Sequence, residues 1–183
     1  PTMSSPLTRF AVTALALVGF AGSAQALEFM DVTLDACDAY GCEGSKLYLS
    51  VQEEAGGSWL VTYTINTDDY TGSQTGFNQI GFKAIQGWTS GSVLSAPSGS
   101  VDDWNPIFDD PIASNSQCDK SSGDTDKVGV FGFVDITAGG DYPWTFRLDD
   151  GTLITDTAGW HLGAQYADAS GPARGKIISA EGP

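Results

Sequence analysis

One stretch, "SWLVTYTINT" at residues 58–67, restricts the fold more than any other feature of the 183-residue chain. Its large apolar side chains stand at every second position: Trp59, Val61, Tyr63 and Ile65. Because successive side chains of a β-strand point to opposite faces, this spacing predicts a strand with one buried face and one solvated face. The segment is therefore expected to lie in a sheet that covers a core.

Period-two spacing returns elsewhere in the chain. It places Leu47, Leu49 and Val51 on one face of "KLYLSVQ", and it recurs in "YPWTFRLDDGTLIT" (142–155). Within the latter segment, Asp150-Gly151 is a dipeptide that favours a type I′ turn, which predicts a hairpin between the flanking strands. "VGVFGFVDI" (128–136) is apolar on both faces and predicts a central strand buried on both sides.

The remaining apolar runs complete the set of expected strands. They are "LEFMDVTL", "FNQIGFKAI", "SVLSA", "WHLGAQYA" and "RGKIISAE". About nine or ten strands are predicted in all, separated by Gly-, Ser- and Asp-rich turns, and no segment after residue 26 has the spacing of an amphipathic helix. This pattern favours an all-β, two-sheet β-sandwich, jelly-roll-like, with a closed barrel as the alternative.

The N-terminus predicts export. Arg9 precedes the apolar run "FAVTALALVGFAG", and Ala24 and Ala26 are the small residues that signal peptidase requires near its cleavage site. The run is shorter than the about 20 apolar residues that cross a bilayer. Residues 1–26 are therefore expected to be a signal peptide and residues 27–183 a single β-sandwich domain, secreted or at the cell surface.

The charge of the chain excludes one large class of partners. It carries 23 acidic residues against 8 basic ones, for a formal net charge of −15. Such a field repels phosphate backbones and anionic lipids, so no nucleic-acid function is expected. The hydrophobic share of 41% is that of a folded chain and not of a disordered one.

Three cysteines are present in a chain expected to be exported, where disulfides persist. A bridge between Cys37 and Cys42 would close a short local loop and leave Cys118 unpaired within the chain. A bridge from either of them to Cys118 would join two distant loops. The local Cys37–Cys42 pairing is favoured, and the long-range alternative stays open.

No residue of the sequence is predicted to be catalytic. His161 is the only histidine and so the only candidate base for a serine or cysteine hydrolase. It alternates out of phase with Trp160 and Leu162, and the chain has no G-x-S-x-G motif. His161 is expected to be an ordinary strand residue, hydrogen-bonded or solvated.

Clustered aspartates leave a polysaccharide-acting hydrolase as a second alternative. They are Asp102, Asp103, Asp109 and Asp110 in "DDWNPIFDD", with Asp149 and Asp150 at the expected hairpin. A glycosidase would need two carboxyls about 5–10 Å apart across a cleft. Turns and solvated loops explain these aspartates more simply.

Calcium is the one cofactor that the sequence brings into consideration. "DKSSGDTD" offers the carboxylates of Asp119, Asp124 and Asp126 in a polar loop, although its spacing is not that of an EF-hand. Solvated loops of this composition also arise without a metal in so acidic a chain. No firm metal site is predicted.

Two tryptophans are candidates for sugar binding. Trp88 and Trp104 lie in loop-like sequence, near Tyr70 and Phe108, whereas Trp59, Trp144 and Trp160 belong to the expected core. Exposed aromatic rings are the stacking platforms that β-sandwich modules present to polysaccharide. A carbohydrate-binding module is therefore the first alternative function.

The last part of the chain resembles a known class of exported proteins. "WHLGAQYADASGPARGKIISAEGP" (160–183), "GFNQIGFKAIQGW" (76–88) and "SNSQC" (114–118) are similar to segments of PEP-CTERM proteins. The resemblance implies sorting by an exosortase in a Gram-negative bacterium that makes extracellular polysaccharide. It also implies a C-terminal tail of Pro-Glu-Pro, an apolar helix and arginines, so the reading frame is expected to continue beyond Pro183.

The expected function follows from export and this resemblance. The chain is predicted to be a non-catalytic protein of the cell surface or the extracellular matrix, associated with extracellular polysaccharide and biofilm. Membrane contact is expected only through the signal peptide or the C-terminal tail. The closing segment "RGKIISAE" is expected to pair with "WHLGAQYA" as the last strand of the domain.

Overall fold

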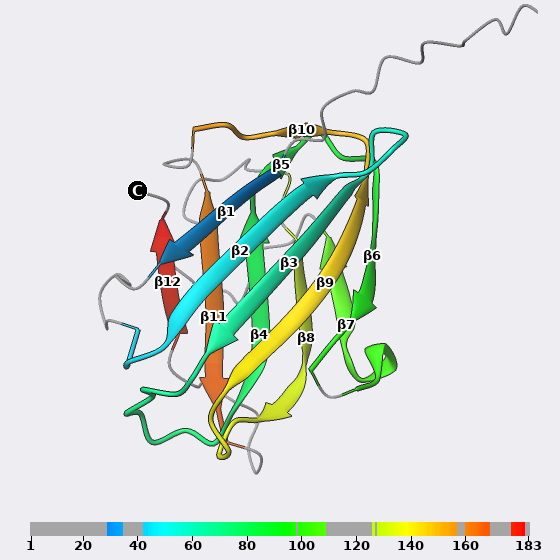
Figure 1. Ribbon diagram of the computed structural model, residues 1–183. Helices are drawn as coiled ribbons and strands as arrows, with labels where there is room; N and C mark the ends of the chain where they lie inside the picture. The colour runs from blue at the N-terminus through cyan, green and yellow to red at the C-terminus, as the bar shows by residue number, and fades with distance from the viewer. Residues whose placement is uncertain are drawn as a thin grey trace, which may run out of the picture.

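The computed structural model describes residues 29–34, 42–97, 99–108, 126, 128–156, 160–168 and 177–181. They form two five-stranded antiparallel sheets with a two-stranded ribbon across one end (Figure 1). The first sheet has the order β1 (Phe29–Leu34), β2 (Lys46–Glu53), β3 (Trp59–Asn66), β9 (Asp141–Asp149) and β6 (Ser90–Ser95). The second has the order β12 (Ile177–Glu181), β11 (His161–Ala167), β4 (Gly76–Lys83), β8 (Val128–Asp135) and β7 (Asn105–Phe108). The ribbon pairs β5 (Ile85–Gln86) with β10 (Thr152–Leu153), and a 3-10 turn, η1 (Val101–Asp103), precedes β7.

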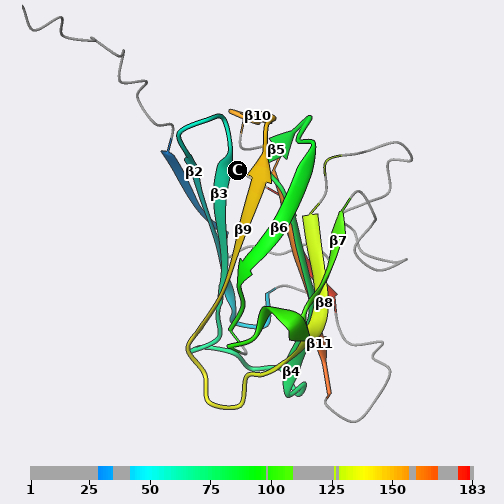
Figure 2. The same cartoon turned by 90° about the vertical axis from the view of Figure 1, so that its right-hand side faces the viewer.

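The predicted two-sheet β-sandwich is confirmed. Viewed from the side, the two sheets form separate layers, so the described strands do not form the closed barrel that was the alternative (Figure 2). The chain passes from one sheet to the other between β3 and β4, between β6 and β7, and between β8 and β9. Such crossing connections are expected of a jelly-roll-like topology.

The first sheet follows the alternation read from the sequence. Along β3 the burial is strictly alternate, with Trp59, Val61, Tyr63 and Ile65 all 4% exposed or less. Val61 stands opposite Phe146 of β9, so buried residues of neighbouring strands face the same core. This packing of cross-strand neighbours stabilises the sheet.

The second sheet is buried on both faces along its middle strands. β4 is buried at every position except Lys83, and β11 at every position except His161. On the face that points away from the core, Gln79 is 1% exposed and stands opposite Gln165, which is 6% exposed. Burial on both faces was predicted for the neighbouring β8, where it is wrong, because Phe131 is 45% exposed.

The turn at Asp150-Gly151 has the backbone of a type I′ turn but does not form the predicted hairpin. The φ angles are +63° and +92°, both in the left-handed region that this turn requires. However, the next strand, β10, pairs with β5 and not with β9. A Cβ on Gly151 would lie 2.8 Å from Ile85 Cγ2, so close packing against β5 draws the chain across the end of the sandwich.

The core contains the three tryptophans that were expected there. Trp59 is 4% exposed, and Trp144 and Trp160 are fully buried. The indole N–H of Trp160 donates to Ile154 O at 2.6 Å, and that of Trp59 to Gly151 O at 3.4 Å. These bonds satisfy polar groups that would otherwise be costly to bury.

The closing strand also lies where the sequence placed it. β12 pairs with β11 in antiparallel register, with His161 opposite Glu181 and Gln165 opposite Ile177. β12 is therefore an edge strand of the second sheet, and β11 lies between it and β4. Among the described residues, none belongs to a helix long and apolar enough to cross a membrane.

Candidate functional site

Two loops at the lower end of the sandwich in Figure 1 line a depression. One loop joins β3 to β4 and the other joins β8 to β9. They are tied together by backbone hydrogen bonds, because Ile136 N donates to Thr75 O and Thr67 N donates to Gly140 O, each at 2.9 Å. The two walls of the depression are thus held at fixed separation in the free protein.

The depression is polar and has the size of a ligand site. Its volume of about 470 Å³ lies within the range of about 300–1,000 Å³ typical of small-molecule pockets. Its lining consists of Thr67, Asp68, Tyr70, Gly72, Ser73, Gln74, Thr75, Ile136, Thr137, Ala138 and Gly139. Hydroxyl, amide, carboxylate and backbone groups from both loops therefore surround one space.

A tyrosine network supports one wall of the depression. The ring of Tyr70 stacks on that of Tyr166 with centroids 4.7 Å apart. The hydroxyl of Tyr70 donates to Gln74 Oε1 at 3.1 Å and accepts from Gln74 N at 3.2 Å. The hydroxyl of Tyr166 is hydrogen-bonded to that of Ser45 in the interior. Tyr70 is consequently anchored to the core on one side and to its own loop on the other.

Burial and nearby acid keep these two phenols protonated. Desolvation, followed by the negative charge of Glu43, raises the pKa of Tyr70 from 10.0 to about 12. Desolvation also raises the pKa of Tyr166, and the hydrogen bond from Ser45 opposes that shift. Both hydroxyls are therefore neutral hydrogen-bonding groups at physiological pH and have no role as bases there.

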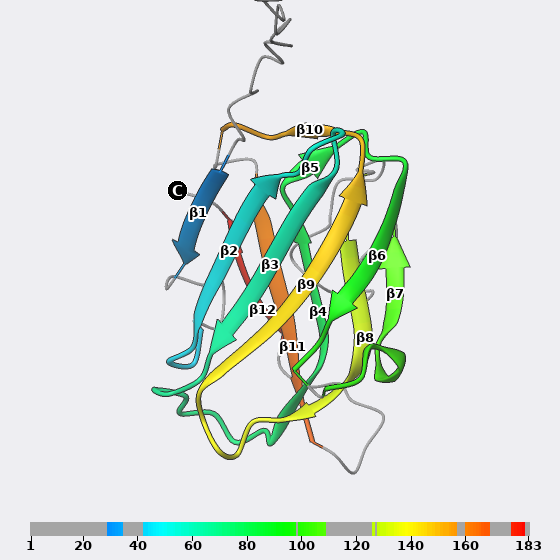
Figure 3. The same ribbon diagram turned by 45° about the vertical axis from the view of Figure 1, so that its right-hand side comes forward.

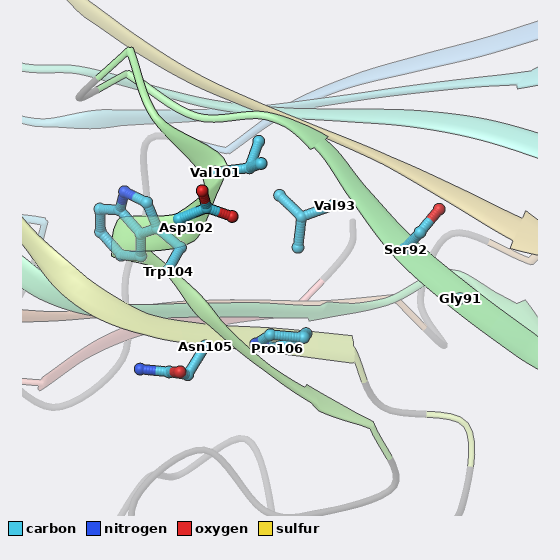
Figure 4. A pocket seen from close by; sticks show the side chains of 8 residues that line it. All are labelled: Gly91, Ser92, Val93, Val101, Asp102, Trp104, Asn105 and Pro106. Atoms are coloured by element: carbon cyan, nitrogen blue, oxygen red, sulfur yellow. The ribbon is translucent and has the colours of Figure 1, made fainter.

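A second concave region lies along one lateral edge of the sandwich. Its lining comes from β6, η1 and β7 and from Trp104 between them. β6 is one edge strand of the first sheet and β7 one edge strand of the second, and both lie on the same side of the sandwich (Figure 3). The groove has a volume of about 410 Å³, with Trp104 and Asp102 at one end and Gly91 and Ser92 at the other (Figure 4). Val93 reaches into it from β6, and Pro106 from β7 (Figure 4).

Trp104 does not occupy the exposed loop position expected for a sugar-stacking ring. It is 2% exposed and makes an edge-on contact with Trp144, with centroids 5.2 Å apart. Gly132 of β8 permits this packing, because a Cβ there would lie 2.7 Å from Trp104 Cδ2. The sequence around Trp104 is loop-like, but the missing side chain at Gly132 creates a place for the indole in the core.

Trp88 is half-buried and packs against the core beside the β5–β10 ribbon. It therefore lies at the opposite end of the sandwich from the polar depression. Asp126, one of the three candidate calcium ligands, accepts a hydrogen bond from Gly87 N at 2.6 Å. Asp119 and Asp124 lie outside the described residues, and the described part of the chain contains no group of acids, histidines and cysteines arranged to hold a metal. A calcium role for the loop stays a prediction, as does sugar binding by Trp88.

The described aspartates of the hydrolase alternative are exposed or bonded to neighbouring hydroxyls. Asp102 and Asp103 lie exposed in η1, while Asp149 accepts from Ser90 Oγ at 2.5 Å and from Ser58 Oγ at 3.2 Å. These bonds lower the pKa of Asp149, which is opposite to the shift that a general acid requires. Asp109 and Asp110 are not among the described residues.

His161 is half-exposed at the start of β11, between Lys83 of β4 and Glu181 of β12. This is the strand position expected for it. Cys42 is 5% exposed, whereas Cys37 and Cys118 lie outside the described part of the chain, so the Cys37–Cys42 pairing stays a prediction. The same holds for the signal peptide at residues 1–26.

Comparison with protein-family models, with curated proteins and with solved structures finds no match for this chain. The site must therefore be interpreted from its own geometry. The sequence has a long polar stretch at 66–76, between two predicted strands, which forms one half of the depression, but no site was predicted there. It did not indicate the short 136–140 loop, since only the crossing from β8 to β9 brings that loop alongside.

Proposed function

We propose that this chain is an exported, non-catalytic protein of the cell surface or extracellular matrix that associates with extracellular polysaccharide. The observation that carries the proposal is the polar depression between the β3–β4 and β8–β9 loops. Sugars present many hydroxyl groups, and a lining of fixed hydroxyl, amide and carboxylate groups can exchange hydrogen bonds with them. Because the loops are already tied together, binding would require little ordering of the protein.

Charge restricts the kind of polysaccharide. The depression contains Asp68, and Glu43 and Asp168 lie close to the tyrosine that lines it. With a net charge of −15 on the chain, a polymer of uronic acids or phosphates would be repelled. The proposed ligand is therefore a neutral or amino-bearing polysaccharide.

A glycan array probed with residues 27–183 tests this proposal. We expect neutral or amino-sugar oligosaccharides to bind and acidic ones to give no signal. Ala138→Met should abolish binding by filling the depression, whereas Ala138→Ser should bind as the unchanged protein does. Absence of binding to every neutral and amino-sugar glycan would contradict the proposal.

The same array separates the first alternative, in which the protein is a carbohydrate-binding module that uses an aromatic platform at Trp88. In that case Trp88→Ala would lose binding and Ala138→Met would retain it. The observation in favour of this alternative is that Trp88 is only partly buried, so part of its surface stays accessible while the rest packs against the core.

We also propose that the protein is sorted by an exosortase, which rests on the resemblance of its strands to PEP-CTERM proteins. The test is to read the gene beyond Pro183 and to follow the protein in cells with and without an exosortase gene. Sorting predicts a Pro-Glu-Pro tail and accumulation of the uncleaved form in the deletion strain. A chain processed identically in both strains would exclude it.

A further inference from the structure

The edge strand β6 differs in sequence from the other three edge strands. It pairs with β9 on one side, and no strand of the described residues pairs with its other side. Ser90–Ser95 contains no charged residue and no proline, whereas β7 contains Pro106, β1 contains Asp31 and β12 ends at Glu181. Natural sheets commonly protect their edges with charge or proline. β6 has neither, although the chain is rich in acidic residues.

An irregularity in β6 limits the open edge without removing it. The register with β9 is regular from Ser90 to Val93 and shifts between Val93 and Ser95, where Leu94 is 43% exposed. Bulges of this kind interrupt pairing. The regular part, Ser90–Val93, still presents backbone N–H and C=O groups on its outer side that pair with no described strand.

The groove next to this edge can receive side chains. Its apolar lining comes from Val93, Val101, Trp104 and Pro106 (Figure 4). Polar groups stand at its rim, from Ser92 on β6, Asp102 in η1 and Asn105 on β7. An extended chain beside β6 would direct every second side chain into the groove and the others to solvent.

We propose that the groove between β6 and β7 binds an extended, basic segment of a partner protein, which adds to β6 as a sixth strand of the first sheet. Backbone hydrogen bonds to Ser90–Val93 provide the pairing, as in other cases of strand addition. Small β-branched side chains of the partner fill the space between Val93 and Pro106. This site is separate from the polysaccharide depression and does not depend on it.

Charge determines the choice of partner. Asp102 lies exposed at one end of the groove, the exposed Asp103 follows it in η1, and no charged residue of β6 offsets them. Lysine or arginine next to the pairing segment would be attracted, which favours association with a basic partner. A second copy of the chain would bring another net charge of −15 to the same edge, so self-pairing is disfavoured.

The test uses the synthetic peptide Lys-Thr-Val-Thr-Val-Thr-Lys with residues 27–183. We expect saturable binding, with slower hydrogen exchange at the amides of Ser90–Val93 and no change in β2 or β3. Two control peptides isolate the causes. Replacing both lysines by glutamates should remove the attraction, and N-methylation of both valines should remove the backbone pairing while leaving the side chains in place.

A protein variant tests the position of the site. Ser92→Lys places a positive charge at the rim and should weaken binding of the lysine peptide on the order of tenfold. The matched control is Ser50→Lys, which adds the same charge to the outer face of β2, between β1 and β3. Both variants should unfold at a similar denaturant concentration, because Ser92 is exposed and Ser50 is half-exposed.

Several results would overturn the proposal. One is equal binding of the N-methylated peptide, and another is equal binding of the glutamate peptide. A failure of the lysine peptide to bind, or protection at β1 in place of β6, would also exclude it. Protection of β6 that rises with protein concentration in the absence of peptide would identify a second copy as the occupant and would contradict the basic partner.

Discussion

The two sheets of this sandwich bury their strands in different ways. In the first sheet, β3 and β9 alternate between buried and more exposed residues, as expected for a sheet with one solvated face. In the second sheet, β4 and β11 are buried on both faces, including the polar residues Gln79 and Gln165. We therefore expect a charged side chain to be tolerated on the outer face of the first sheet and to be destabilising on the outer face of β4 and β11.

The largest expected effect comes from placing a charge on each outer face in turn. In Gln79→Glu, an uncompensated carboxylate would replace an amide that is 1% exposed, which should lower the free energy of unfolding by about 3 kcal/mol or more. In Thr62→Glu, the same charge on half-exposed β3 should change it by less than about 0.5 kcal/mol. Urea unfolding of both variants at pH 7 measures the difference.

The pH dependence of the same pair distinguishes charge from shape. The penalty of Gln79→Glu should shrink as the pH falls toward about 4, because the introduced carboxyl then becomes protonated. No described donor reaches Oε1 of Gln79, so Gln79→Leu should be tolerated far better than the glutamate. Equal costs for glutamate and leucine would show that side-chain shape, and not buried charge, limits this position.

The first sheet could be predicted from the sequence, whereas much of the second could not. Alternation at Trp59–Ile65 identifies both the strand and its buried face, since one side of β3 is solvated. In β8 the sequence is mostly apolar or small on both faces, and in β4 the polar pair Asn78-Gln79 interrupts the period-two spacing. Period two then no longer says which strand is covered on both faces. Burial on both faces was predicted for β8, where Phe131 is exposed, and it occurs instead in β4 and β11.

The candidate site was harder to predict because it depends on how the chain crosses between sheets. The loop that contains Tyr70 is polar in the sequence, but the other loop of the site, at 136–140, follows Tyr70 by 66 to 70 residues. Trp104 was misplaced for a similar reason. Its burial depends on the absence of a side chain at Gly132, a residue of another strand. Contacts of this kind, between residues far apart in the sequence, become visible only once the pairing of the strands is known.

Gly132→Ala tests whether the second sheet requires that missing side chain. The added Cβ would lie 2.6 Å from Asp103 O and 2.7 Å from Trp104 Cδ2, so the indole or the η1 backbone must move. Overpacking of this kind should cost about 1–3 kcal/mol. Thermal unfolding measures the loss, and quenching of tryptophan fluorescence by acrylamide should increase as Trp104 becomes exposed. Ser50→Ala in the first sheet is the control and should change neither.

Alkaline titration tests the tyrosine network that links the second sheet to the polar depression. The pKa of Tyr70 in the folded protein, about 12, is above its ordinary value of 10.0. The folded state therefore holds its proton more tightly than the unfolded state does. The stability that this provides is fully present below pH 10 and is lost as the pH rises from 10 to 12. In Tyr70→Phe, the fall in the free energy of unfolding over this range should be shallower. An unchanged slope would exclude ionisation of Tyr70 as a cause.

The smallest expected effect lies at the margin of the doubly buried region. Gly163 and Gln165 share the outer face of β11 with His161 and are buried, whereas His161 itself is half-exposed. At this first position of the strand, loss of the imidazole leaves little buried surface uncovered, so His161→Ala should change the free energy of unfolding by about 0.5 kcal/mol or less. Chemical unfolding beside the unchanged protein measures it, and any hydrolytic activity detected in the protein should persist in the variant. A loss of about 2 kcal/mol would extend the doubly buried region to the start of β11. Disappearance of a hydrolytic activity would instead contradict the non-catalytic function proposed for the chain.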